Sequence, residues 1–238
     1  MSKPIPFRKK DVTDKLDYAL DRHQELMDIL FQSKKAASDP KFLVHTCADI
    51  LSTARECFDY LAQDIIECYI IPSTSNQKIK KDHSSGKLRC YFPYYESQIN
   101  KPESPFFELA TASAPFYQSL LDFTRSIARN VTIPNTRYTY KMLLDVKDMV
   151  NEKKHDKLIA VVSNADGEYL IENESIRMVL PLQSQSGWSY FVVEPGTSVQ
   201  RVAEYRFAYN NQEVGKFCQF ATEATKHVIG ELYDFYFD

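Results

Sequence analysis

The chain has 238 residues, a formal net charge of −3 and an isoelectric point near 6.0. This charge excludes a protein that binds polyanions over its whole surface, although a local basic patch remains compatible with it. Glycine occurs only 6 times, and neither the GxGxxG nor the P-loop pattern is present, so no phosphate-binding loop is predicted. The hydrophobic content of 44% is sufficient for a sizeable core, and we expect a single domain over 1–238.

The sequence carries no targeting or metal-binding pattern. Its basic start lacks the apolar run of a secretory signal, and no apolar stretch is long enough to span a bilayer. The 5 cysteines form no CxxC pair, and His45 and Cys47 have no partner ligands at metal spacing. We therefore expect a cytoplasmic protein with free thiols, no cofactor, no bound metal and no membrane partner.

Two long helices are predicted in the first part of the chain. Over 8–36, one helical face carries Leu16, Leu20, His23, Met27 and Leu30. Over 40–70, the face of a second helix carries Ile50, Ala54, Phe58, Leu61 and Ile65. The polar stretch 72–90 that follows predicts an exposed loop, and 91–95 predicts a short extended aromatic segment.

Two further helices are predicted before the character of the sequence changes. Pro105 opens a short helix, and a longer helix restarts at Ser113, because Pro115 is tolerated only in a first turn. Its apolar face carries Phe116, Leu120, Phe123 and Ile127. The next helix is predicted over 136–155, with Thr136 as its cap and with apolar Met142, Val146, Met149 and Val150.

From Leu158 the hydrophobic period is that of strands. Strands are predicted over 158–163, 169–171, 176–182, 189–193 and 202–209, with a hairpin turn at Asp166-Gly167. From Gln212 a last helix presents Val214, Phe217, Ala221, Val228, Leu232 and Phe235 on its apolar face. The predicted fold is mainly α: a helical bundle over 8–156, a small antiparallel sheet inserted over 157–210 (α+β), and a helix over 211–238 that packs back on the bundle.

The candidate chemistry lies at the end of the fourth helix. Asn151 and His155 are four residues apart and share a helical face, and Lys154 adds a cation beside them. This group suits proton transfer and phosphate binding during RNA cleavage, or it caps the last carbonyls of the helix. Arg55 has two corresponding interpretations, a phosphate clamp or a helical ion pair with Asp59.

A second candidate is the basic stretch within 72–90, which precedes the aromatic residues 91–95. Cations followed by exposed aromatic rings are typical of single-stranded nucleic-acid binding, whereas an isolated lysine-rich loop is more often simply solvated. The cations of this stretch are Lys78, Lys80, Lys81, Lys87 and Arg89.

Three segments resemble bacterial HEPN-like proteins. The segment 51–61, with Arg55 at its centre, resembles their arginine-containing helix, and 92–94 resembles the Phe-Pro segment that follows it. The segment 143–158, with Asn151, Lys154 and His155, resembles their "L-N-x-x-KH-x-L" helix end. The resemblance covers residues 40–160 and implies a helical bundle, often dimeric, in a family rich in ribonuclease toxins and phage-defence effectors.

The resemblance does not extend to the catalytic signature of the family. In active members four to six residues separate an arginine from a following histidine, and none of the 5 histidines here is preceded by such an arginine. The sequence therefore predicts a binding or regulatory module, with RNA, a second copy or another protein as partner. The alternatives are a divergent metal-independent ribonuclease that uses His155, Lys154, Arg55 and Asn151, and a purely structural module that makes contacts through 91–95.

Overall fold

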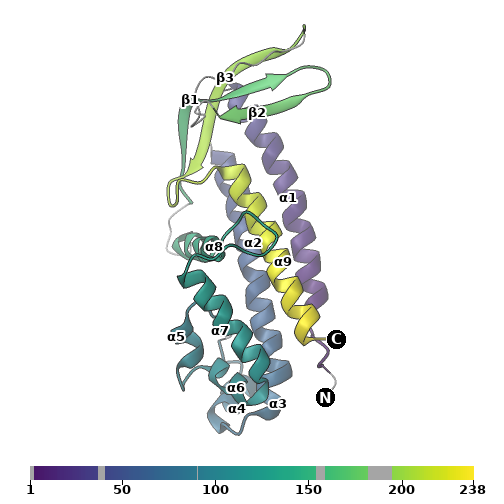
Figure 1. Cartoon of the computed structure of the whole chain (residues 1–238), viewed down its shortest axis with the longest axis vertical. Coiled ribbons are helices and arrows are strands. Elements are labelled where there is room, and N and C mark those ends of the chain that lie inside the picture. The colour runs from purple at the N-terminus through teal and green to yellow at the C-terminus, as the bar shows by residue number, and fades with distance from the viewer. Residues whose placement is uncertain (1–2, 37–40, 90, 154–158, 182–194) are drawn as a thin grey trace.

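The computed structural model describes residues 3–36, 41–89, 91–153, 159–181 and 195–238. It is a helical bundle with a small antiparallel sheet placed before the last helix, as predicted (Figure 1). Three long helices lie side by side in the bundle: α1 (Lys9–Ala36), α2 (Lys41–Ile65) and α9 (Val214–Tyr236). The sheet lies across one end of these helices, and both ends of the described chain lie at the other.

The helix α2 is the central element of the core. All five residues of its predicted apolar face are buried, and the helix packs against α1, α9 and α8 (Tyr140–Lys153). The prediction for α1 is only partly right, since Leu16 and Leu30 are buried but Leu20 is 38% exposed. Ala19 and Leu26 are buried on α1 instead.

The segment after α2 is helical up to residue 70, as predicted, but the loop predicted over 72–90 contains a further helix. The helix continues through a π-helical turn, η1 (Ile66–Ile70), into α3 (Ile71–Ser73). A further helix, α4 (Gln77–Ser84), then forms inside the stretch predicted as a loop. The Asn76 side chain caps α4 by accepting hydrogen bonds from the backbone of Lys78 and Ile79, and Ile79 is buried. The sequence did not predict α4 because Ile79 is a single apolar residue among lysines and forms no helical repeat.

The middle of the chain follows the prediction more closely. The elements are α5 (Glu96–Asn100), η2 (Pro105–Glu108), α6 (Leu109–Ala112) and α7 (Ala114–Ala128). Ser113 precedes α7, a proline occupies its first turn, and all four residues of its predicted apolar face are buried. Thr136 was wrongly predicted to cap α8. It lies in a turn closed by bonds to Ile133 and Tyr138, and α8 begins at Tyr140.

The sheet has the order β2-β1-β3 and is antiparallel. The hairpin predicted at Asp166-Gly167 is wrong, because one long strand, β1 (Val161–Glu172), runs through these residues. It pairs with β3 (Ser198–Phe207) on both sides of an irregularity between Asn164 and Glu168. The turn signal is therefore absorbed in a bulge. β2 is Arg177–Pro181, and the predicted strand 189–193 lies outside the described residues.

The hairpin between β1 and β2 is formed by an Asx turn. The Asn173 side chain accepts hydrogen bonds from the backbone of Ser175 and Ile176.

The last helix packs back on the bundle, as predicted. It contacts α1 and α2 along its length, and Val214, Phe217, Ala221 and Val228 are buried. Two residues of the predicted apolar face point elsewhere: Leu232 is only half-buried and Phe235 is 70% exposed. Tyr233 takes their place against the core, because its hydroxyl finds a buried partner there.

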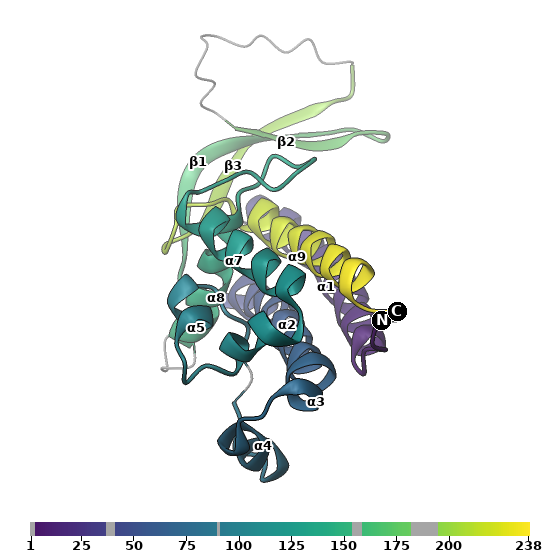
Figure 2. The ribbon, with the colours of Figure 1, turned by 60° about the horizontal axis from the view of Figure 1, so that its bottom comes forward.

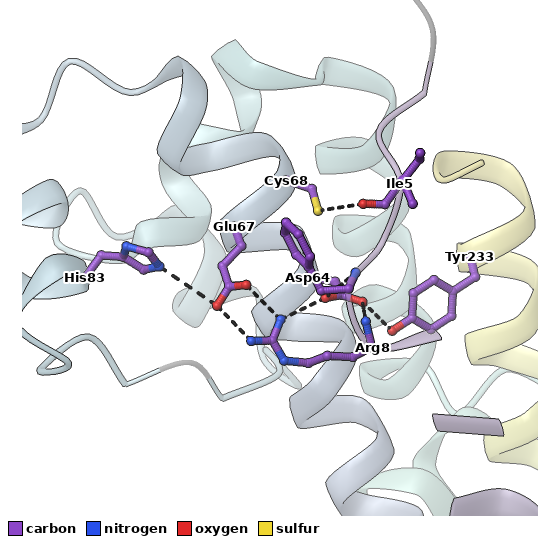
Figure 3. A network of polar contacts seen from close by, with 8 residues as sticks. Ile5, Arg8, Asp64, Glu67, Cys68, His83 and Tyr233 are labelled. Carbon is purple, nitrogen blue, oxygen red and sulfur yellow. Dashed lines mark hydrogen bonds and ion pairs between the residues drawn. The ribbon is translucent and has the colours of Figure 1, made fainter. Parts of the chain in front are cut away.

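That partner is Asp64, whose side chain is completely buried at the end of α2 (Figure 3). Its carboxylate accepts hydrogen bonds from the backbone of Phe7 and Arg8, from the Arg8 guanidinium at 2.9 Å, and from the Tyr233 hydroxyl at 3.0 Å. Arg8 also binds Glu67 through two nitrogens, each at 2.9 Å. One carboxylate on α2 thus fixes both the start of α1 and the last turns of α9.

We expect Asp64→Ala to lower the free energy of unfolding by about 3–5 kcal/mol, because four donors would lose their buried acceptor. Urea unfolding followed by circular dichroism measures the loss. Asp234→Ala is the control, since this carboxylate is 75% exposed in its pair with Lys9 and should contribute less than about 1 kcal/mol. Equal losses in the two variants would contradict the role of Asp64.

The thiol of Cys68 reports on the same region. Burial, and then the charge of Asp64, raise the pKa of Cys68 to about 11, and its Sγ donates to the Ile5 carbonyl at 3.5 Å. The folded state therefore holds the Cys68 proton more tightly than the unfolded state does. This difference stabilises the folded state fully at pH values below the pKa of the unfolded thiol, and the stabilisation is lost as the pH rises toward 11. We expect slow alkylation of Cys68 by iodoacetamide at pH 8.5, measured by mass spectrometry, and faster alkylation in Asp64→Ala.

Candidate functional site

Arg55 lies in the middle of α2, on the side covered by α8 and by the aromatic segment 91–95. Its residue exposure is only 8%, and its Nη2 lies 3.2 Å from an Asp59 carboxylate oxygen. The predicted helical ion pair is therefore confirmed. Because the pair is buried, both charges have lost most of their hydration and depend on each other.

The pair holds the aromatic segment against α2. The Arg55 guanidinium carbon lies 5.8 Å from the centroid of the Tyr91 ring, and an Asp59 oxygen accepts a hydrogen bond from the Phe92 backbone at 3.2 Å. Phe92 and Tyr94 are buried, whereas Tyr91 and Tyr95 are 52% and 42% exposed. The segment is thus largely part of the core, and only two of its rings are available for contacts with a partner.

The helix α8 adds charged groups on the other side of the segment. The Lys147 ammonium lies 5.1 Å from the centroid of the Tyr95 ring and 2.7 Å from the Asp148 carboxylate. Burial raises the pKa of Tyr94, and the carboxylates of Asp59 and Asp148 contribute to the same shift. Charges from α2 and α8 therefore converge on one tyrosine.

The predicted site residues are only partly brought together. Arg55 is on α2, Asn151 is half-buried on α8, and these two helices pack against each other. Lys154 and His155 lie outside the described residues. The proposed proximity of His155 to Arg55 therefore stays a prediction.

The Nε of Arg55 is one of three buried side-chain nitrogens without a hydrogen-bond partner among the described residues, with Arg22 Nε and His227 Nε2. A buried donor without an acceptor costs about 1–3 kcal/mol, so each such group in a native protein calls for a physical explanation, such as a bound water or ion or a functional role. The sequence alone could identify the pair with Asp59 from its spacing, but it could not reveal this remaining donor.

The basic stretch 78–89 is a second feature that the structure defines. Its five cations are all exposed: Lys78, Lys80, Lys81, Lys87 and Arg89. The first three belong to α4, which projects from the body of the molecule (Figure 2). Because α4 is a capped helix, the backbone positions of these lysines follow helical spacing rather than that of an irregular loop. The Asn76 cap was the signal that could have located this helix.

The other histidines have structural environments. The Nε2 of His23 lies 3.1 Å from the Gly215 carbonyl oxygen, and the residue is half-buried on the face predicted for the first helix. His227 lies 3.4 Å from Glu231, and His83 lies 3.9 Å from Glu67.

The described residues contain no group of three or more side chains that could hold a metal ion. Within the same ranges, every helix is too short or too polar to cross a membrane. The cysteines at 47, 57, 68 and 218 are free, and Cys90 lies outside the described residues. Comparison with models of known protein families gives no match, and neither a curated protein nor a solved structure matches this chain.

We expect Arg55→Met to lower the free energy of unfolding by about 3–5 kcal/mol, because it leaves the half-buried Asp59 carboxylate without its cation. Thermal and urea unfolding measure the effect. Arg125→Met is the matched control: Arg125 pairs with Glu96 at 3.0 Å, but both side chains are at least 40% exposed, so the expected loss is below about 1 kcal/mol. A neutral effect of Arg55→Met would show that the pair does not stabilise the fold.

Proposed function

We propose that this chain is a divergent HEPN-like binding module that recognises single-stranded RNA and does not cleave it. The observation that carries the proposal is the arrangement of cations and rings between α4 and Tyr91. Five exposed cations lead along 78–89 to a half-exposed tyrosine whose ring lies over the buried Arg55 guanidinium.

The cations support contacts with the phosphate backbone. Three lysines on α4 supply point charges around its exposed surface, while the chain as a whole carries a net charge of −3. Binding to a polyanion would therefore be confined to this strip rather than spread over the surface. An extended single strand fits this layout, because its phosphates can follow Lys78 to Arg89 while a base reaches Tyr91.

Tyr91 supports contacts with a base. Its ring is 52% exposed, and Arg55 lies near it at 5.8 Å, so the ring is held in place by a group that is itself buried. A base stacked on such a ring contributes about 1–3 kcal/mol without selecting a sequence. Stacking of a base on Tyr91 would explain why this ring is exposed although the neighbouring rings of Phe92 and Tyr94 are buried.

The absence of cleavage follows from the missing catalytic signature and from the state of Arg55. The guanidinium is already paired with Asp59 and is 8% exposed, which leaves little of it for a transferring phosphate. The resemblance also implies a dimer and a role in phage defence or in a toxin system, and we retain both as part of the proposal.

A second function, metal-independent RNA cleavage, is favoured by the unpartnered Arg55 Nε and by the packing of α2 against α8. In that case Arg55 and Asn151 would position a phosphate, while Lys154 and His155 would supply charge and proton transfer. This alternative predicts RNA cleavage in the presence of EDTA that is lost in His155→Ala. The binding proposal predicts that neither the unaltered protein nor the His155→Ala variant cleaves RNA.

We expect fluorescence anisotropy to show binding of a labelled 15-nucleotide oligouridine, with an affinity that falls as salt rises. Replacing Lys78, Lys80 and Lys81 together by glutamine should weaken binding and reduce the slope of log K against log salt by about 2, at about 0.7 per charge. Tyr91→Leu should weaken binding by about tenfold with the slope unchanged, because stacking is lost and charge is not.

The matched controls are Lys101→Gln and Lys226→Gln, which remove exposed lysines elsewhere, and Tyr18→Leu, which removes an exposed ring on α1. None of the three should change the affinity for the RNA. If the α4 variant binds as tightly as the unaltered protein while remaining folded, the proposal is wrong.

A further inference from the structure

A cleft of about 340 Å³ lies between α7 and α9, two helices that run side by side in Figure 2. Four of the residues that line it are aromatic: Phe123, Tyr140, Phe235 and Tyr236. Two carboxylates, Asp122 and Glu231, line it as well, and no lysine or arginine is among the described residues of its wall. The cleft therefore combines aromatic surface with negative charge.

The rings at the base of the cleft are held firmly. Phe123 and Tyr140 meet edge to face with centroids 5.6 Å apart. Tyr236 is stacked on Phe116 at 4.0 Å, and its hydroxyl lies 2.6 Å from the Ser119 hydroxyl. These contacts fix the direction of the ring faces, so a ligand would meet preformed surfaces rather than mobile side chains.

Phe235 forms the open side of the cleft. It is 70% exposed, although it follows Tyr233 on a helix whose other large side chains are mostly covered. An exposed phenylalanine at the rim of an aromatic cleft indicates a surface that a ligand would cover.

The carboxylates face the same space from both helices. Burial raises the pKa of Tyr140, and Glu231 on α9 adds to the shift, which places its charge close to that ring. Asp122 on α7 accepts a hydrogen bond from Gln118 at 2.8 Å, and the nearest cation, Arg125, lies 3.8 Å away and is engaged with Glu96 at 3.0 Å. His227 lies 3.4 Å from Glu231. The negative charge is thus only partly compensated.

We propose that this cleft binds an organic cation, specifically an alkylated ammonium group. The faces of aromatic rings attract such cations electrostatically, and carboxylates at the rim add charge complementarity. Four of the ten described residues that line the cleft present aromatic rings, which attract an alkylated ammonium group but are not ligands for a hydrated inorganic ion. The cleft shares no residue with the basic stretch 78–89 or with Tyr91, so this proposal can be tested independently of RNA binding.

The test uses choline and its uncharged isostere 3,3-dimethyl-1-butanol, with binding followed by the shift of the methyl proton signals on titration with the full chain. The two probes have nearly the same shape, so any preference reports charge. We expect choline to bind at least about tenfold more tightly, which corresponds to about 1.4 kcal/mol. Equal affinities, or no shift of the choline signal at millimolar concentration, would overturn the proposal.

Two variants separate the contributions of charge and ring. Glu231→Gln should weaken choline binding about tenfold, and Phe235→Leu about fivefold, while neither should unfold the chain because both side chains lie at the surface. Glu223→Gln on the same helix and Phe107→Leu on η2 are controls that lie outside the cleft and should bind choline unchanged. Losses of equal size in the variants and the controls would refute the assignment.

A final arm identifies the source of the ammonium group. The same titration with the blocked amino acid acetyl-trimethyllysine amide presents it as part of a protein side chain. Tighter binding of this probe than of choline would assign the cleft to a modified lysine of a partner. Tighter binding of choline would assign it to a free small molecule. Failure of both probes to bind would exclude the site.

Discussion

The bundle depends on the burial of a single carboxylate, Asp64. Its four donors come from the chain just before α1 and from α9, so the three long helices meet at one charged group. Such a contact is directional, whereas apolar packing alone would tolerate a shift of one helix along another. The fixed register of α1 and α9 against α2 in turn positions the sheet, because β1 begins after α8 and β3 leads directly into α9.

The buried charged side chains of Asp64 and Arg55, both on α2, differ in how completely they are hydrogen-bonded. The Asp64 carboxylate, at the end of the helix, has its partners within the chain, whereas the Arg55 Nε, in its middle, has no acceptor among the described residues. The proposed function accordingly places its site at the middle of α2, where α8 and the aromatic segment cover it.

The helical fold could be predicted because its signals are local. The face of α2 repeats every three to four residues, and Pro115 marks the start of α7. The errors arise where tertiary contacts outweigh local signals: Asp166-Gly167 lies in an irregularity of a strand whose flanking residues pair with β3, and Phe235 remains exposed although it fits the apolar pattern. Spacing predicted the Arg55–Asp59 pair, but long-range contacts such as Arg8–Asp64 leave no periodic trace in a sequence.

The π-helical turn at Ile66–Ile70 sets the rotation of the helix that continues directly from it. A π turn holds one residue more than an α turn, so α3 is rotated relative to an uninterrupted helix. Since each residue of an α-helix advances the chain by about 100°, removing one residue here would turn α3 by roughly a quarter of a circle. The chain would then leave α3 in another direction before the non-helical residues 74–76 and α4, so the length of this turn bears on where the lysines of α4 lie.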